Sequence, residues 1–151
     1  MQKLKILNSK EVKNIRKILK EQFGYDEKSN LVFTLNNKEK LYVVNRDIER
    51  LDIDKLRIDL IGMYFAKQEP KGIRLSIEGS QMIGPKATKN LLELNDNQFE
   101  DWLKGKDFDI DQKDGFYLIK YDGLFVGCGK VRGGYLMNYV PKSRRLIVVN
   151  N

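Results

Sequence analysis

The sequence feature that most constrains the fold is a pair of apolar runs separated by two turn residues. Residues 116–121 and 124–131 are rich in β-branched and aromatic side chains, and Asp122-Gly123 joins them. This pair is suited to a tight hairpin turn, because both residues tolerate positive φ angles. We therefore expect a strong antiparallel hairpin in the C-terminal half.

Shorter elements surround this hairpin. Alternation of apolar and polar residues predicts strands at residues 73–77 and 145–149. A short helix broken near Gly84-Pro85 is expected in the segment through Ala87, and another follows Asn95 or Asp96. Many short strands with only short helices predict a closed or nearly closed β-barrel.

The N-terminal half has a different pattern. Helical spacing of apolar residues predicts a helix over residues 9–22, capped by Ser9. Residues 31–35 and 41–44 are expected to form a hairpin, followed by a helical turn at 47–51 and a half-buried strand at 56–60. The fold class is therefore α+β.

The two halves are separated by Pro70-Lys71-Gly72, which interrupts the chain near its midpoint. We expect an N-terminal α+β module at residues 1–70 and a second domain at residues 71–151.

Positive charge is concentrated near the two chain ends. The chain has 28 Lys and Arg against 21 Asp and Glu, a formal net charge of +7. Residues 1–20 hold seven bases and one acid, and residues 128–151 hold five bases and no acid. Residues 96–114 hold seven acids. This polarity favours a polyanionic partner, because phosphate contacts release counterions.

Other features exclude several classes of protein. The chain has no histidine and one cysteine, Cys128, so the usual zinc sites and catalytic triads lack their main residues. No apolar stretch approaches the ~18 residues that a membrane helix needs, and the first residues lack a signal-peptide core. A cytoplasmic protein is expected.

Three stretches carry a family resemblance. They are residues 74–85 (Arg-Leu-Ser-Ile-Glu-Gly-Ser-Gln-Met-Ile-Gly-Pro), 125–131 (Phe-Val-Gly-Cys-Gly-Lys-Val) and 138–145 (Asn-Tyr-Val-Pro-Lys-Ser-Arg-Arg). The chain resembles archaeal-type Sun/Fmu-associated ribosome biogenesis proteins, and its second half resembles the PUA-like RNA-binding tail of Sun/Fmu RNA cytosine methyltransferases. The resemblance implies an N-terminal α/β pre-PUA-like module followed by a PUA-like β pseudo-barrel. It also implies binding of structured RNA through the first helix of that domain, the loop after it and a late strand.

Candidate RNA-binding residues follow from this resemblance and from the side-chain chemistry. Arginine and lysine suit phosphates, and tyrosine stacks on unpaired bases. The candidates are Ser80, Gln81, Lys86, Lys89, Lys130, Arg132, Asn138, Tyr139, Lys142, Arg144 and Arg145. The competing interpretation is that the basic residues form an ordinary solvated face and the tyrosines belong to the core.

No catalytic or metal-binding residue is predicted. Gly127-Cys128-Gly129 does not continue into a helix within a βαβ unit, which argues against a dinucleotide loop. Cys128 lies in an apolar strand and has no histidine to activate it, so a structural thiol is expected. Asp107, Asp109 and Asp111 alternate with apolar residues as on the wet face of a strand, and Glu78 is expected to bond backbone amides in a turn.

The resulting hypothesis is a non-catalytic protein without a cofactor that binds structured rRNA or tRNA during ribosome biogenesis or RNA modification. Besides the RNA, an RNA-modification or ribosome-assembly protein is a candidate partner, whereas neither DNA nor a membrane is expected. Two alternatives stay open. One is an adaptor whose basic ends contact acidic protein surfaces, and the other is an RNA-modifying enzyme that uses carboxylates alone.

Overall fold

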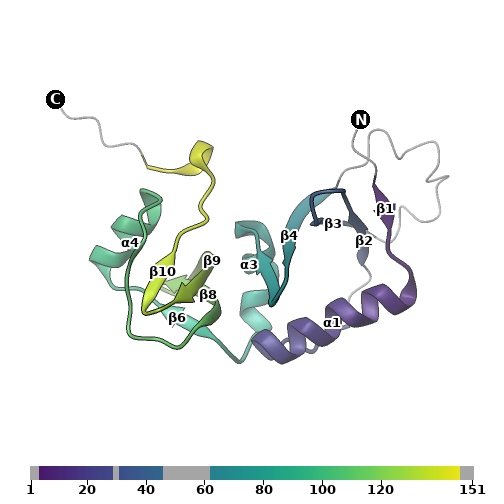
Figure 1. Cartoon of the computed structure of the whole chain (residues 1–151), viewed down its shortest axis with the longest axis horizontal. Helices are drawn as coiled ribbons and strands as arrows, with labels where there is room; N and C mark the ends of the chain where they lie inside the picture. The colour runs from purple at the N-terminus through teal and green to yellow at the C-terminus, as the bar shows by residue number, and fades with distance from the viewer. Residues whose placement is uncertain (1–3, 29–30, 46–61, 147–151) are drawn as a thin grey trace.

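The computed structural model describes residues 4–28, 31–45 and 62–146 and contains two five-stranded sheets (Figure 1). One sheet comes from the N-terminal half and the other from the C-terminal half. Helix α3 (Ile77–Ile83) lies between them and contacts both β4 and β9. The α+β class predicted from the sequence is therefore confirmed.

The N-terminal sheet is antiparallel throughout, in the order β1-β2-β3-β4-β5. Its strands are β1 (Lys5–Ile6), β2 (Leu31–Leu35), β3 (Lys40–Asn45), β4 (Met63–Glu69) and β5 (Gly72–Leu75). The predicted hairpin of residues 31–35 and 41–44 is confirmed as β2–β3. The helical turn expected at 47–51 and the strand expected at 56–60 lie outside the described residues.

Helix α1 (Ser9–Phe23) packs its apolar stripe on this sheet and buries Ile15, Leu19 and Phe23. The sequence predicted Ser9 as the N-cap of this helix, but the N-cap is Asn8. The Asn8 side chain accepts a hydrogen bond from the Glu11 amide (2.9 Å), and the Glu11 carboxylate accepts one from the Asn8 amide (3.2 Å). This reciprocal pair satisfies two amides that the first helical turn leaves unpaired.

The C-terminal sheet has the order β6-β8-β9-β10-β7 and curls into a half-barrel. Its strands are β6 (Leu91–Glu93), β7 (Phe108–Asp109), β8 (Gly115–Tyr121), β9 (Leu124–Arg132) and β10 (Tyr135–Met137). Only the edge strand β6 is parallel to its neighbour among these described strands. The β8–β9 hairpin is the predicted one, and Asp122 (φ 48°) and Gly123 (φ 79°) both have the positive φ that its turn requires.

Three short helical elements follow α3, and the first of them directly continues it. They are α4 (Asp96–Leu103) and the 3-10 turns η2 (Gly84–Lys86) and η3 (Lys142–Arg144). Asn95 caps α4 by accepting from the Gln98 amide, one of the two caps that the sequence proposed. The break near Gly84-Pro85 is the change from α3 to η2.

Two predicted strands differ from the described structure at one of their ends. The strand at 73–77 ends at Leu75, because Ser76 accepts a hydrogen bond from the Gly79 amide (2.9 Å) and caps α3 from Ile77 onward. The strand at 145–149 does not include Arg145 and Leu146, which follow the η3 turn in irregular backbone. Residues 147–149 lie outside the described part of the chain.

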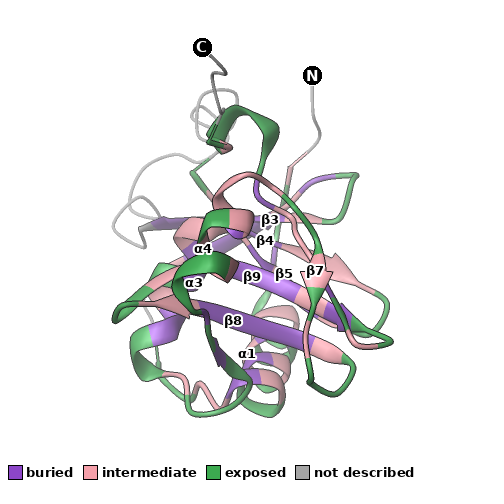
Figure 2. Ribbon diagram, turned by 90° about the vertical axis from the view of Figure 1, so that its left-hand side faces the viewer, coloured by how far each residue is buried: buried purple, intermediate pink, exposed green. Residues whose placement is uncertain are grey.

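The two sheets share one hydrophobic core. Phe116, Leu118 and Cys128 of the C-terminal sheet belong to the same buried cluster as α1 and the N-terminal sheet. The opposite face of the β8–β9 hairpin packs on Trp102 of α4 in a second cluster. Figure 2 shows the resulting buried stretches in the middle of β8 and β9.

The predicted boundary at Pro70-Lys71-Gly72 falls within the N-terminal sheet, because β5 follows Pro70 and pairs with β4. The division into units 1–70 and 71–151 stays a prediction about which segments fold on their own. Among the described helices, none has the length and apolar character that a membrane crossing requires.

The close contact of α3 with β4 gives a stability prediction. Gly79 lies against the backbone of Phe65, so the methyl group of Gly79→Ala would overlap the Phe65 carbonyl oxygen. Alanine is the better helix former, so any loss of stability must come from this overlap. We expect the free energy of unfolding to fall by about 1–3 kcal/mol in urea denaturation.

The exposed Gln81→Ala substitution on the same helix is the control for this experiment. It should change stability by less than about 0.5 kcal/mol. A Gly79→Ala variant as stable as the wild type would contradict the tight packing of α3 on β4.

Candidate functional site

The face of the C-terminal sheet that is turned toward β5 carries basic residues at its end. Cys128, Lys130 and Arg132 alternate along β9, so they project from one face of the sheet. Lys130 is paired with Phe116, whose ring lies next to Gly72 at the start of β5. This face is therefore buried at Cys128 and becomes exposed at Arg132.

Strand β10 extends this face with aromatic residues. Tyr135 is paired with Arg132 and is 43% exposed. Tyr139 follows the end of β10, and its ring packs against the Arg74 guanidinium of β5, with 3.8 Å from Arg74 Cζ to the ring centroid. Burial raises the pKa of the Tyr139 hydroxyl, an effect that the nearby Arg74 charge partly offsets.

Arg74 is a site residue that sequence reasoning did not single out. It alternates with Ile73 and Leu75 and so has the pattern of an ordinary solvent-facing strand residue. In the structure its Nε donates to the Glu69 carboxylate (3.1 Å), and its side chain is only 17% exposed. The Arg74 guanidinium thus lies over the Tyr139 ring and is held by Glu69 through its Nε.

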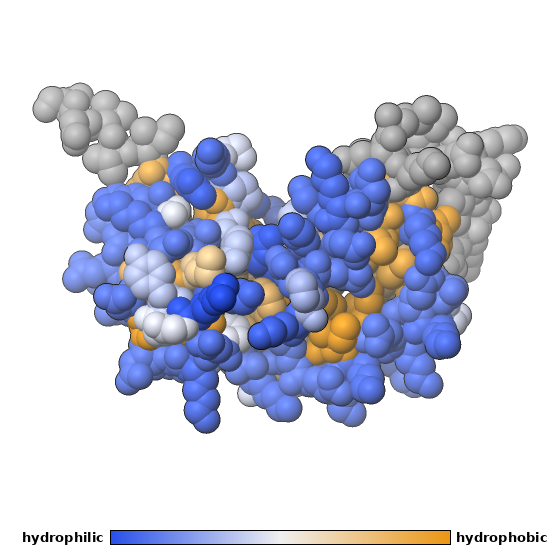
Figure 3. Space-filling view, in the orientation of Figure 1, coloured by the Kyte–Doolittle hydropathy of each residue, from blue (hydrophilic) through white to orange (hydrophobic). Residues whose placement is uncertain are grey.

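A cavity of about 140 Å³ lies between the two sheets. The side chains that matter most in its lining are Tyr64, Arg74, Glu78, Trp102, Tyr139 and Arg144. Trp102 is 1% exposed and forms the inner side, whereas Glu78 and Arg144 are 39% and 45% exposed and lie toward solvent. Figure 3 shows the space between the two halves of the molecule as a hollow walled mainly by hydrophilic side chains.

Glu78 is paired with Arg144 across the edge of this inter-sheet cavity. The sequence had suggested that the Glu78 carboxylate would bond backbone amides of its turn. The segment is instead the first turn of α3, and the carboxylate accepts from the Arg144 guanidinium. The pair joins η3 to α3 and brings the C-terminal basic run next to the cavity.

We use the name seam surface for the basic and aromatic residues along the junction of the two sheets. Its members are Arg74, Lys130, Arg132, Tyr135, Tyr139 and Arg144. Four of the predicted RNA-binding residues, Lys130, Arg132, Tyr139 and Arg144, are thus brought together. Lys142 lies beside them, exposed in the η3 turn.

Three predicted residues are used inside the fold. Ser80 is fully buried, and its hydroxyl donates to the Ser76 carbonyl (2.7 Å). The Asn138 amide group donates to the carbonyls of Trp102 (2.9 Å) and Lys106 (3.1 Å). Arg145 donates through Nε to the Val140 carbonyl (3.0 Å). Ser80 therefore stabilises the start of α3, Asn138 joins the segment after β10 to the end of α4, and Arg145 has only part of its guanidinium available.

The remaining predicted residues lie elsewhere on the surface. Lys86 lies at the end of the η2 turn, beyond the C-terminal end of α3. Lys89 is next to the end of α1, where its amide donates to the Phe23 carbonyl (3.0 Å). Gln81 is exposed beside an apolar groove that includes Leu124 and Phe125. The structure does not bring these three residues to the seam surface.

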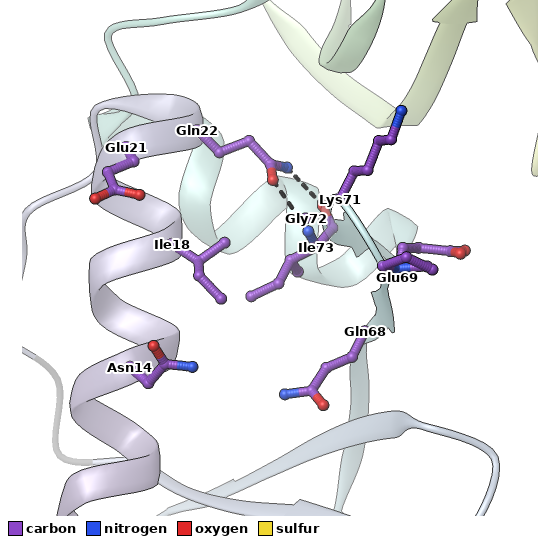
Figure 4. Close-up of a pocket in the computed structure, with 10 residues that line it drawn as sticks. Asn14, Ile18, Glu21, Gln22, Gln68, Glu69, Lys71, Gly72 and Ile73 are labelled. Carbon is purple, nitrogen blue, oxygen red and sulfur yellow. Dashed lines mark hydrogen bonds between the residues drawn. The ribbon is translucent and has the colours of Figure 1, made fainter.

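A second, open groove of about 560 Å³ lies between α1 and β5 (Figure 4). Its residues include amide and carboxylate side chains of Asn14, Glu21 and Gln68. Gln22 crosses it at one end, donating to the Ile73 carbonyl (2.6 Å) and accepting from the Ile73 amide (3.0 Å). This bridge fixes α1 to the strand that carries Arg74.

The carboxylates considered in the sequence do not converge. Asp107 accepts from the Asn138 amide (2.7 Å), and Asp109 is exposed on β7, while Glu78 is paired with Arg144. Among the described residues, no group of three acidic or cysteine side chains has the geometry of a metal site.

Cys128 has the environment of a structural thiol. It is buried in the shared core, and burial raises the pKa of its thiol to about 12. A neutral thiol is a poor nucleophile, because the thiolate is the reactive form. This side chain therefore contributes packing to the site and no nucleophilic chemistry.

Thiol labelling tests this assignment. At pH 9, about one thiol in a thousand is ionised when the pKa is about 12. We expect the folded protein to resist Ellman's reagent at this pH over a period in which the urea-unfolded chain reacts completely. Rapid stoichiometric labelling of the folded protein would contradict the buried position of Cys128.

Comparison with known proteins agrees with this architecture. Residues 89–146 match the family model described as the methyltransferase RsmF PUA domain. The ribosomal RNA small subunit methyltransferase F of Aeromonas salmonicida is 34% identical over 99 residues, which are 64% of this chain and 20% of that protein. Its counterpart in Aeromonas hydrophila is 29% identical over 147 residues, 96% of this chain and 30% of that protein.

The chain thus spans 20–30% of the length of these two relatives. The longer alignment includes both sheets, while the family model begins after η2 and covers the C-terminal sheet. The resemblance to Sun/Fmu-related proteins with a PUA-like tail is confirmed. Residues 89–146 of this chain are therefore similar to the PUA domain of RsmF-type methyltransferases.

Proposed function

We propose that this chain is a non-catalytic RNA-binding protein that contacts structured rRNA or tRNA during ribosome biogenesis or RNA modification. The observation that carries the proposal is the clustering of basic and aromatic side chains on the seam surface of an RsmF-type PUA domain. The relatives are ribosomal RNA methyltransferases by name. This supports rRNA as the first RNA to test.

The chemistry of the seam surface suits RNA. Arg132 and Arg144 present planar guanidinium groups that match phosphate oxygens, and Lys130 supplies a point charge. Tyr135 is 43% exposed and can stack on an unpaired base. Such a surface contacts both the backbone and the bases of a folded RNA.

Three observations support a non-catalytic role. The family model that matches is that of a PUA domain. The Cys128 thiol is buried and neutral, and the described carboxylates that the sequence considered lie apart. We infer that any chemistry on the RNA is performed by a partner protein of an RNA-modification or ribosome-assembly complex, in the cytoplasm.

The seam surface gives a binding prediction. Arg132 and Lys142 are both exposed, so replacing them together with alanine removes two charges with little effect on the core. We expect affinity for a structured rRNA fragment to fall roughly tenfold at about 0.1 M salt. The slope of log affinity against log salt should fall by about 0.7–0.9 for each lost phosphate contact.

The Lys10→Ala, Lys17→Ala double variant is the matched control, because it removes the same charge from the exposed side of α1. Its affinity should change much less than that of the Arg132, Lys142 variant. Equal losses in the two variants would refute a defined RNA-binding face and indicate attraction by net charge alone. No RNA affinity in the wild type at moderate salt would favour the protein-adaptor hypothesis.

A further inference from the structure

We propose that the inter-sheet cavity receives a single unpaired nucleobase of the bound RNA, stacked on the Arg74–Tyr139 pair. This inference rests on the proposed RNA binding and specifies what the seam surface recognises. An RNA with a bulged or looped-out nucleotide would then be preferred over a fully paired one. Four features of the cavity support this specificity.

The first feature is its size. The cavity holds about 140 Å³, close to the volume of five water molecules at about 30 Å³ each. Pockets for drug-sized ligands have about 300–1,000 Å³. The space is therefore suited to one small planar ring and is too small for a large cofactor.

The second feature is the flat wall. Arg74 Cζ lies over the Tyr139 ring, 3.8 Å from its centroid, so the guanidinium covers one face of the ring. Unpaired bases stack on aromatic rings and on guanidinium planes in RNA complexes. Glu69 holds Arg74 in this orientation through its Nε, so the wall is formed before RNA arrives.

The third feature is the presence of donors and acceptors around the wall. Tyr64, which carries a hydroxyl, and Glu78, which carries a carboxylate, line the same cavity as Arg74. A base carries both donors and acceptors on its pairing edge, and this edge is free when the base is unpaired. Glu78 is paired with Arg144 near solvent, where ion pairs are weak. A phosphate can attract Arg144 and leave the carboxylate to accept a hydrogen bond from the base.

The fourth feature is a pair of tyrosine rings on the N-terminal sheet, beside the cavity. The rings of Tyr42 and Tyr64 lie 5.7 Å apart, and Lys40 Nζ lies 5.4 Å from the centroid of the Tyr64 ring. Lys40 and Tyr42 are on β3, beside the Tyr64 end of the cavity. They provide charge and stacking area for the nucleotide that neighbours the inserted base.

Two other hollows of the described surface lack this combination. The groove between α1 and β5 is open and lined by amides, carboxylates and Lys71, and no aromatic residue lines it (Figure 4). The groove beside Gln81 is lined by apolar side chains and by one charged residue, Lys120. The inter-sheet cavity combines aromatic rings, guanidinium groups and a carboxylate.

The test compares two hairpin RNAs that differ only by one bulged nucleotide in the stem. Affinity is measured by fluorescence anisotropy of labelled RNA. Trp102 is the only tryptophan of the chain and lines the cavity, so its emission reports entry of a base. We expect about tenfold tighter binding of the bulged hairpin, in the range known for base–aromatic stacking, and quenching of Trp102 by that RNA only.

Variants test whether the preference for the bulged hairpin depends on the Tyr139 ring in the cavity wall. Tyr139→Ala should reduce the affinity for the bulged hairpin to that for the paired one, whereas Tyr139→Phe should keep the preference because the ring remains. Arg132→Ala removes a phosphate contact outside the cavity and should weaken both RNAs equally. Thermal unfolding of each variant shows whether the fold is intact.

The wild-type comparison decides the inference even if Tyr139→Ala fails to fold. Equal affinities for the two hairpins, with unchanged Trp102 emission, would overturn the cavity as a base site and leave RNA binding by the seam surface in place. Absence of binding to either hairpin would overturn both proposals.

Discussion

The structure depends on one packing interaction, in which one face of the β8–β9 hairpin packs against the N-terminal sheet and α1 in a shared core. Phe116, Leu118 and Cys128 are buried there together with side chains of α1 and β5. Full burial of each large apolar side chain contributes about 1.5–3 kcal/mol. The two sheets are therefore held in one fixed relation, and every feature at their junction is fixed with them.

The seam surface and the inter-sheet cavity are consequences of this packing. Neither sheet contains the cavity alone, because Tyr64 and Arg74 come from one sheet, whereas Trp102 and Tyr139 come from the other half of the chain. The two arginines at the junction are each paired with a carboxylate, Arg74 with Glu69 and Arg144 with Glu78. The Arg74–Glu69 pair is thus largely shielded from solvent, whereas the Arg144–Glu78 pair is more exposed.

The sequence predicted the features that depend on local pattern. The β8–β9 hairpin follows from the apolar runs around Asp122-Gly123, and the α4 helix from its cap and spacing. Features that depend on long-range contacts were not predictable. Ser80 belongs to a family-like motif but is buried by the packing of α3. Arg74 becomes a site residue through its contact with Tyr139, which lies 65 residues further along the chain. The family resemblance predicted where the domain lies in the sequence. Which of its basic residues share one face could be seen only in the structure.

The central claim is that RNA is bound along the junction, by both halves of the molecule at once. Photo-crosslinking of a thiouridine-labelled rRNA fragment, followed by mass spectrometry of the attached peptides, tests it most directly. We expect crosslinks from β4–β5 of the N-terminal sheet and from residues 135–144 in the same complex. Crosslinks confined to Lys86 and Lys89, or to the exposed side of α1, would contradict it.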